Sequence, residues 1–176
     1  MINTIDINKI DIEKYKGLYR KFLDRRETVT LSFMDEKGFP FSSCTPFVEL
    51  NGKLYVYLSE VAEHFKLMQM NERVDALIIA DEVDSNNRFA TERVRWSCRP
   101  KKIGNDGYEE VFDLFNAKFG EKMMNVLRGM DFSLFELTPE SGRYVVGFGL
   151  AFDTNIDASQ FSHVYAEHKM RKRDGK

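Results

Sequence analysis

The stretch FSSCTPFVELNGKLYVYL, residues 41–58, decides the fold because it encodes a β-hairpin in one uninterrupted run. Two segments rich in β-branched and aromatic residues, 41–50 and 53–58, flank Asn51-Gly52, and this pair suits the positive φ angles of a two-residue turn. The preceding segment, Thr28–Met34, alternates as a half-buried strand does and ends at the turn sequence Asp35-Glu36-Lys37-Gly38. The sequence therefore predicts three strands in meander order.

Periodicity predicts the remaining elements around this meander. Helical spacing is expected over Asp11–Arg26, Val61–Met70 and 109–128, the last broken near Gly120. Further strands are predicted at Val74–Ala80, around Arg93–Ser97, at Phe132–Leu137 and at Arg143–Gly149, with Pro100–Gly107 and Pro139–Gly142 interrupting the sheet and a polar tail from Ala151. The fold class predicted is mainly β (α+β), a six-stranded antiparallel barrel with peripheral helices in one domain spanning residues 1–176.

Composition narrows the classes of function. The 176 residues carry 26 Lys+Arg against 28 Asp+Glu, and this near-neutral balance argues against a nucleic-acid-binding face. No apolar run approaches the roughly 20 residues that cross a bilayer, and Met1–Asp6 lacks the features of a signal peptide. Cys44 and Cys98 stand far apart without a CxxC pattern, so we expect reduced thiols, no zinc and a cytoplasmic protein.

Local catalytic signatures such as GxGxxG, GxxxxGK[ST], HExxH and GxSxG are absent, which leaves three histidines for imidazole chemistry: His64, His163 and His168. His168 lies near the end of the chain, where a histidine commonly has no role. A neutral imidazole there is also a competent axial ligand for heme iron. His64 falls on a predicted helix, where an ordinary, partly exposed histidine is the simplest interpretation.

Asp131 and Arg93 are the other candidates. Asp131 precedes an apolar strand, where aspartate usually serves as a boundary residue, but a carboxylate can also hold an imidazole N–H and strengthen a metal ligand. Arg93 and Arg95 are two residues apart on one strand and so share a face. An arginine on such a face is commonly solvated, yet one directed into a cleft would bind phosphate or stabilise bound oxygen.

Several motifs together resemble the heme-utilisation proteins of the HutZ/HugZ type, within the pyridoxamine-phosphate-oxidase-like split β-barrel superfamily. The resemblance spans nearly the whole chain and is carried by TVTLSFMDEKGFP (28–40), the hairpin through Asn51-Gly52, LSEVAEH (58–64), FATER (89–93), DFSLFELTPESG (131–142) and GFGLAF (147–152). The segment from Asp131 and the GFGLAF continuation are its more specific parts.

The resemblance implies a homodimeric split barrel that binds heme near the subunit interface and degrades it with oxygen and a reductant, releasing iron. It implies that His168, in a ligand-bearing tail over residues 151–176, is the proximal iron ligand, with His163 as the alternative. Asp131 would be its hydrogen-bonding partner, from the other subunit. Arg93 would lie on the distal side and His64 near the pocket.

Two rival functions remain open at this point. In flavin-binding relatives a basic residue and hydroxyls after the third strand hold the FMN phosphate, whereas this chain has Val61-Ala62-Glu63-His64, and Glu63 would repel a phosphate. An FMN-binding oxidoreductase would have to use Ser59, Arg93 and Lys66 instead. A non-catalytic heme carrier would use the same ligands as the degrading enzyme.

Overall fold

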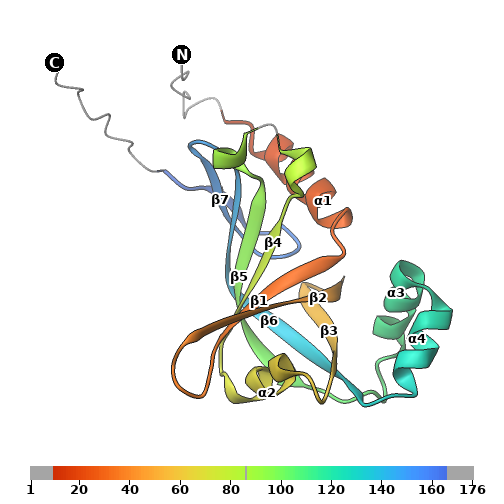
Figure 1. Cartoon of the computed structure of the whole chain (residues 1–176). Coiled ribbons are helices and arrows are strands. Elements are labelled where there is room, and N and C mark those ends of the chain that lie inside the picture. Colours follow the sequence, from red (N-terminus) through yellow and green to blue (C-terminus); the bar gives the residue numbers. More distant parts are fainter. Residues whose placement is uncertain (1–9, 86, 166–176) are drawn as a thin grey trace.

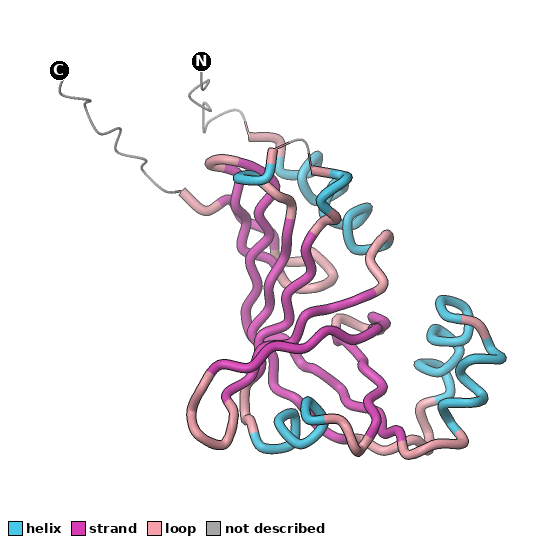
Figure 2. The backbone as a smooth tube through the Cα atoms, in the orientation of Figure 1, coloured by secondary structure: helices cyan, strands magenta, loops and turns pink. Residues whose placement is uncertain are grey.

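The computed structural model describes residues 10–85 and 87–165, and its centre is a closed barrel (Figures 1 and 2). The sheet order is β3-β2-β1-β4-β5-β6-β7-β8, and β3 also pairs with β6. That second pairing closes β1 to β6 into a six-stranded antiparallel barrel, which confirms the predicted fold class. The strands are β1 Thr28–Met34, β2 Pro40–Leu50, β3 Lys53–Ser59, β4 Val74–Ile79, β5 Arg93–Lys102, β6 Phe132–Gly147, β7 Leu150–Thr154 and β8 Phe161–His163.

The β2–β3 hairpin forms as the sequence predicts. Asn51 and Gly52 both adopt positive φ angles, 52° and 74°, and Leu50 pairs with Lys53 across the turn. The Glu49 side chain accepts a hydrogen bond from the Gly52 backbone N–H at 2.9 Å. A primed turn of this kind matches the twist of the two strands and fixes their register.

Strand β6 corrects the prediction of two strands separated by a turn. It runs without a break from Phe132 to Gly147, and the Pro139–Gly142 segment lies inside it. Ser97 pairs with Ser141 while Cys98 pairs with Pro139, so Glu140 is the extra residue of a β-bulge. A bulge admits the proline because the regular hydrogen-bond ladder is already interrupted there.

Strand β5 also continues further than predicted, through Pro100 to Lys102. Its pairing with β4 ends at Cys98, whereas its pairing with β6 continues to the end of the strand. Beyond Cys98 the strand therefore has one neighbour, and the missing N–H of Pro100 is tolerated on the open edge.

The helices are α1 Ile12–Asp24, α2 Glu63–Met70, α3 Glu109–Phe119 and α4 Glu121–Arg128, with short 3₁₀ turns η2 Glu82–Asp84 and η3 Arg88–Ala90. The predicted break falls at Gly120, whose φ is 93°. Helices α1 and α2 lie toward opposite ends of the barrel and both contribute to its main core, while α3 and α4 stand to one side (Figure 1). A second hydrophobic cluster packs α3 and α4 against Tyr55 and Tyr57 on the outer side of β3.

The prediction of a polar tail is wrong for the part of it that the structure describes. Residues 150–154 form β7 and residues 161–163 form β8, with Phe152 fully buried and Ile156 and Ala158 in the main core. The apolar residues are too sparse to form a periodic pattern, yet they complete the packing under α1. Among the described residues no helix combines the length and apolarity needed to span a membrane.

Gly142 supports the continuous β6 through a close contact that no side chain would permit. It is the cross-strand partner of Trp96, which is fully buried. A Cβ on residue 142 would lie 2.2 Å from Trp96 Cδ1 and 2.4 Å from the Thr154 carbonyl oxygen. We expect Gly142→Ala to lower the free energy of unfolding by about 1–3 kcal/mol or more, because the core would have to shift.

Urea denaturation of wild type, Gly142→Ala and Gly17→Ala measures these changes in the free energy of unfolding. Gly17 lies in α1, and a Cβ on residue 17 would meet no atom within 4 Å, so Gly17→Ala should instead stabilise the protein by up to about 1 kcal/mol. A Gly142→Ala variant as stable as wild type would contradict the close packing of Gly142 against Trp96.

Candidate functional site

The sequence-predicted site residues divide between the two ends of β6. At one end, Arg93 on β5 pairs with Val145 on β6, which pairs with Ala151 on β7. The Val164 N–H donates to the Ala151 carbonyl at 2.7 Å. Arg93, Val145, Ala151 and Val164 are therefore neighbours across successive strands. Three strand spacings, about 15 Å, separate Arg93 from the last described residues. We call this region, with Arg93, His163 and the end of the described chain, the tail end.

Two candidate side chains at the tail end, Arg93 and His163, have hydrogen-bond partners. Arg93 is half-buried and its Nη1 donates to the Thr91 carbonyl at 2.9 Å. The His163 ring lies edge-on to Phe152, and its Nε2 donates to the Gly149 carbonyl at 2.8 Å. Because Nε2 is engaged, Nδ1 is the His163 nitrogen left for a ligand. His168 lies outside the described residues.

His64 and Asp131 lie at the other end of β6, which we call the far end. Asp131 immediately precedes β6, and its side chain accepts one long hydrogen bond from Ser59 Oγ at 3.4 Å. Its backbone carbonyl accepts from the Glu60 N–H at 2.7 Å. The carboxylate is exposed and retains acceptor capacity, as a partner for an imidazole N–H requires.

His64 is more constrained than a surface helix residue. Its Nδ1 is 2.6 Å from Ser43 Oγ on β2, so the ring ties α2 to the barrel. Burial lowers the pKa of His64, because desolvation disfavours the imidazolium. At neutral pH the ring is therefore neutral, with Nε2 directed away from this hydrogen bond.

The length of β6 separates the two groups within one chain. Phe132 and Val145 are 13 residues apart on the strand, which corresponds to about 40 Å along it. Tyr165 is the last described residue, and three further residues to position 168 span at most about 10 Å. An Asp131–His168 pair therefore requires two chains.

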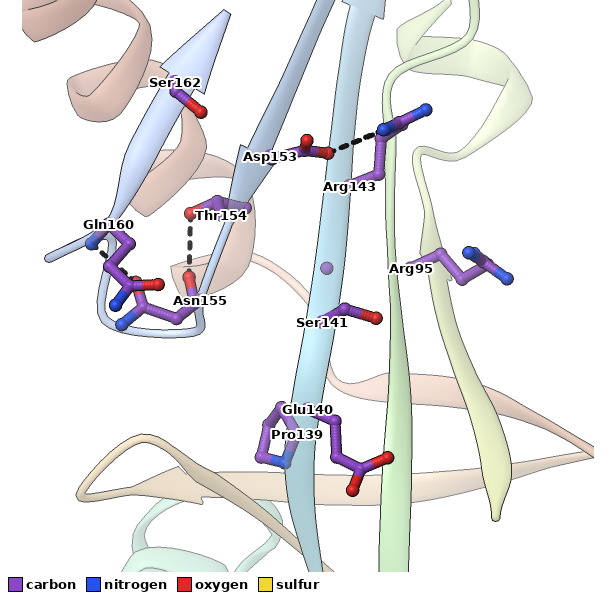
Figure 3. Close-up of a pocket in the computed structure, with 11 residues that line it drawn as sticks. Arg95, Pro139, Glu140, Ser141, Arg143, Asp153, Thr154, Asn155, Gln160 and Ser162 are labelled. Atoms are coloured by element: carbon purple, nitrogen blue, oxygen red, sulfur yellow. Dashed lines mark hydrogen bonds and ion pairs between the residues drawn. The ribbon is translucent and has the colours of Figure 1, made fainter. Parts of the chain in front are cut away.

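Two open grooves lie elsewhere. One, of about 460 Å³, runs over the outer face of β5 to β8 and is polar (Figure 3). Arg143 donates there to Asp153 at 2.8 Å, and Arg95 pairs with Asp75 at 2.7 Å. The other, of about 630 Å³, lies between α1, β2 and α3. Neither groove is lined by Arg93, His64, Asp131 or His163.

One interaction at the tail end has no counterpart in the sequence-based predictions. The hydroxyl of Tyr144, on β6, donates to the Glu92 carboxylate, directly before Arg93 in the chain. Local patterning gives no signal for this pair, because residues 92 and 144 meet only through the β5–β6 pairing. Among the described residues no three His, Cys, Asp or Glu side chains gather as a metal site would require.

Comparison with known proteins identifies the relatives of this barrel. No family model matches the chain. The heme oxygenase HutZ of Vibrio cholerae serotype O1 is 30% identical over 155 residues, which cover 85% of this chain and 87% of that protein. The structure of Campylobacter jejuni ChuZ superposes with a TM-score of 0.82 at 25% identity, covering 94% of this chain and 69% of ChuZ.

Two further structures share the fold of this chain. The structure of HutZ from Vibrio cholerae, named as a heme storage protein, superposes with a TM-score of 0.70 at 26% identity, covering 79% of this chain and 99% of that one. A protein of the pyridoxinephosphate oxidase family from Clostridium acetobutylicum shares the fold with a TM-score of 0.61 at 13% identity, over 84% of this chain and 98% of that one. The fold is thus that of the pyridoxamine-phosphate-oxidase-like split barrels. Among proteins with that fold the chain belongs to the HutZ/HugZ family of heme-utilisation proteins, which confirms the resemblance predicted from its motifs.

The lowered pKa of His64 gives a testable pH dependence. The unfolded chain, with a histidine pKa of about 6.5, binds more protons than the folded chain in the window below that value. The stability linked to His64 is therefore fully present above the unfolded pKa and is lost as pH falls through the folded pKa. Chemical denaturation between pH 5 and 7 should show a steeper loss of stability for wild type than for His64→Gln.

An NMR titration of the three histidines measures the pKa of His64 directly. The resonance of His163 is assigned with the variant His163→Gln. An unfolded-like pKa for His64 would show that its ring is solvated and not held against Ser43.

Proposed function

We propose that this protein binds heme between the two subunits of a homodimer and degrades it with oxygen and a reductant, releasing iron. The observation that carries the proposal is the separation of the site residues along β6: Arg93 and the end of the described chain lie at the tail end, whereas Asp131 and His64 lie at the far end. A two-fold arrangement that brings the tail end of one subunit to the far end of the other would form two complete sites per dimer, each with residues from both subunits.

The relatives support heme as the ligand. HutZ from Vibrio cholerae is described both as a heme oxygenase and as a heme storage protein. These descriptions correspond to the degrading enzyme and the non-catalytic carrier that the sequence leaves open. We favour degradation because the relative that is 30% identical to this chain is named a heme oxygenase.

Exposed apolar side chains at both ends support a flat apolar ligand there. At the tail end, Phe89 in η3 is 87% exposed and Phe148, in the β6–β7 turn, is 54% exposed. At the far end, Val61 and Met130 flank His64 and Asp131 and are 87% and 55% exposed. Contact with a porphyrin face and with the second subunit would remove this apolar surface from water.

The chain's own residues would then divide the work. His168 would ligate the iron, and Asp131 of the other subunit would accept its second N–H, which orients the ring and makes it a stronger donor. Arg93 would supply guanidinium hydrogen bonds on the opposite side of the heme, and His64 would line the pocket with a neutral ring. Bound heme would supply the oxygen chemistry.

The FMN alternative gains little support from the residues that would have to hold its phosphate. Lys66 pairs with Glu36, and Ser59 donates to Asp131. Ser59 pairs with Phe132 and Arg93 with Val145, so Ser59 and Arg93 lie at opposite ends of β6. Within one chain they would not reach the same phosphate, so an FMN site with these residues would also have to be shared between two subunits.

The remaining parts of the proposal concern the form of the protein. We infer one domain spanning residues 1–176, with the tail from 151 bearing the ligand, acting in the cytoplasm without nucleic acid or membrane as partner. The outer face of β4 to β7 carries the Arg95–Asp75 and Arg143–Asp153 ion pairs, and its mixed charges would complement those of a two-fold related copy. The electron donor would be a separate reductant or reductase.

Hemin titration tests the ligand assignment. Wild type should give the Soret band of a histidine-ligated heme, and His168→Ala should lose it because the iron would lack its imidazole. His163→Ala is the matched control and should retain the band. Loss of the band in His163→Ala with retention in His168→Ala would transfer the ligand role to His163.

Mixed dimers test the composite site. In a heterodimer of His168→Ala and Asp131→Ala subunits, one of the two sites carries both defects and the other carries neither. Ascorbate-driven heme loss should therefore recover in the heterodimer although both homodimers are impaired. If no activity returned in verified heterodimers, the site would belong to a single chain. A wild-type protein that holds heme with no loss of the Soret band under the same conditions would instead indicate the carrier function.

A further inference from the structure

Tyr144 and Glu92 form a partly buried hydrogen-bonded pair that the proposed heme site does not use. Tyr144 is fully buried, and its hydroxyl donates to Glu92 Oε1. Glu92 is half-buried and directly precedes Arg93, so the pair lies at the tail end. Burial, and then the hydrogen bond to Glu92, raise the pKa of Tyr144 well above its ordinary value. The phenol therefore keeps its proton at neutral pH.

Tyr144 is also part of a continuous series of aromatic contacts. Its ring centroid is 5.2 Å from that of Tyr19, and Tyr19 is 6.5 Å from Trp96 at the centre of the barrel. In the other direction, Phe152 is 6.3 Å from Tyr144 and 4.9 Å from the half-buried Tyr15. Tyrosine and tryptophan are among the most easily oxidised side chains, so Tyr144, Tyr19 and Trp96 form a short series of oxidisable rings, whereas Phe152 serves only as packing between Tyr144 and Tyr15.

Comparison with two other buried tyrosines, Tyr19 and Tyr55, distinguishes Tyr144. Tyr19 has the aromatic neighbours, but its hydroxyl donates to the backbone carbonyls of Asn155 and Ile156, which are too weakly basic to take a proton. Tyr55 donates to the Glu136 carboxylate at 3.1 Å, but the aromatic ring pairs of its strand among the described residues involve Tyr57 and not Tyr55. Tyr144 combines a carboxylate acceptor with aromatic neighbours, and oxidation of a phenol is easiest when its proton has a base to go to.

We propose that Tyr144 and Glu92 are a proton-coupled redox site that removes oxidising equivalents from the tail end of the barrel. A one-electron oxidant, of the class that heme and hydrogen peroxide generate, takes one electron from Tyr144. The phenolic O–H bond breaks and its proton passes to Glu92, which leaves a neutral tyrosyl radical and a glutamic acid. A one-electron reductant such as ascorbate returns one electron to the tyrosyl radical while the proton returns from Glu92.

The biological role rests on the proposed function, because a protein that activates oxygen at heme produces stray oxidants. The chemistry of the pair does not require heme to be present and is tested without it. Flash photolysis of the heme-free protein with a ruthenium tris-bipyridine sensitiser and a cobalt(III) quencher generates the oxidant, and rapid freezing followed by EPR detects the radical. Wild type should give a tyrosyl signal, which Tyr144→Phe should lose.

Glu92→Gln preserves the shape of the acceptor but removes its basicity, so it should also lose the signal. The matched control is Tyr55→Phe, which removes the other tyrosine bonded to a glutamate and should retain it. Thermal melting establishes that each variant is folded. If Tyr144→Phe does not fold, Glu92→Gln decides the question, because its side chain is only half-buried.

A wild-type signal that persists unchanged in folded Glu92→Gln, or that disappears in Tyr55→Phe, would overturn the proposal. A tyrosyl signal at Tyr144 in a protein that fails to bind hemin would sustain the redox site while rejecting the heme function. Hemin binding by a protein that gives no tyrosyl signal would support the heme function and reject the redox site.

Discussion

The structure depends on the pairing of a single long strand. The first half of β6 lies between β3 and β5 and closes the barrel, whereas its second half lies between β5 and β7 and extends the sheet beyond the barrel. This continuity requires Gly142 opposite Trp96 and a bulge at Glu140. The Glu140 carboxylate is in turn held by Arg73 and Arg99, so the irregular position is fixed from outside the core as well.

The same strand determines what one chain is able to do. Its two ends carry different halves of the candidate site, and the core between them is filled by buried aliphatic and aromatic side chains. A ligand contacted by both halves must lie outside the barrel, between copies of the chain. The pairing that stabilises the monomer therefore also makes association necessary for the proposed function.

Much of the fold could be predicted because its signals are local. Asn51-Gly52, the alternation of Thr28–Met34 and the break at Gly120 each depend on the backbone preferences of a few neighbouring residues, and all three agree with the structure. The Pro139–Gly142 segment looks like a turn for the same reason: proline and glycine usually mark turns, and their use at a bulge and opposite a tryptophan depends on the partner strand. The short β7 and β8 escape prediction because their apolar residues are buried by α1, which is distant in sequence.

The sequence by itself determined the barrel class, the family and the residue types available for chemistry, because turn preferences, periodicity and family motifs are properties of neighbouring residues. Only the tertiary structure decided which of those residues meet. The separation of Arg93 from Asp131 and the pairing of Tyr144 with Glu92 follow from the pairing of β5 with β6, and the contact of His64 with Ser43 follows from the packing of α2 against β2. A tight turn fixes the register of a hairpin, but contacts between elements that are distant in the sequence depend on side chains that pack together in the core, and no local pattern predicts them.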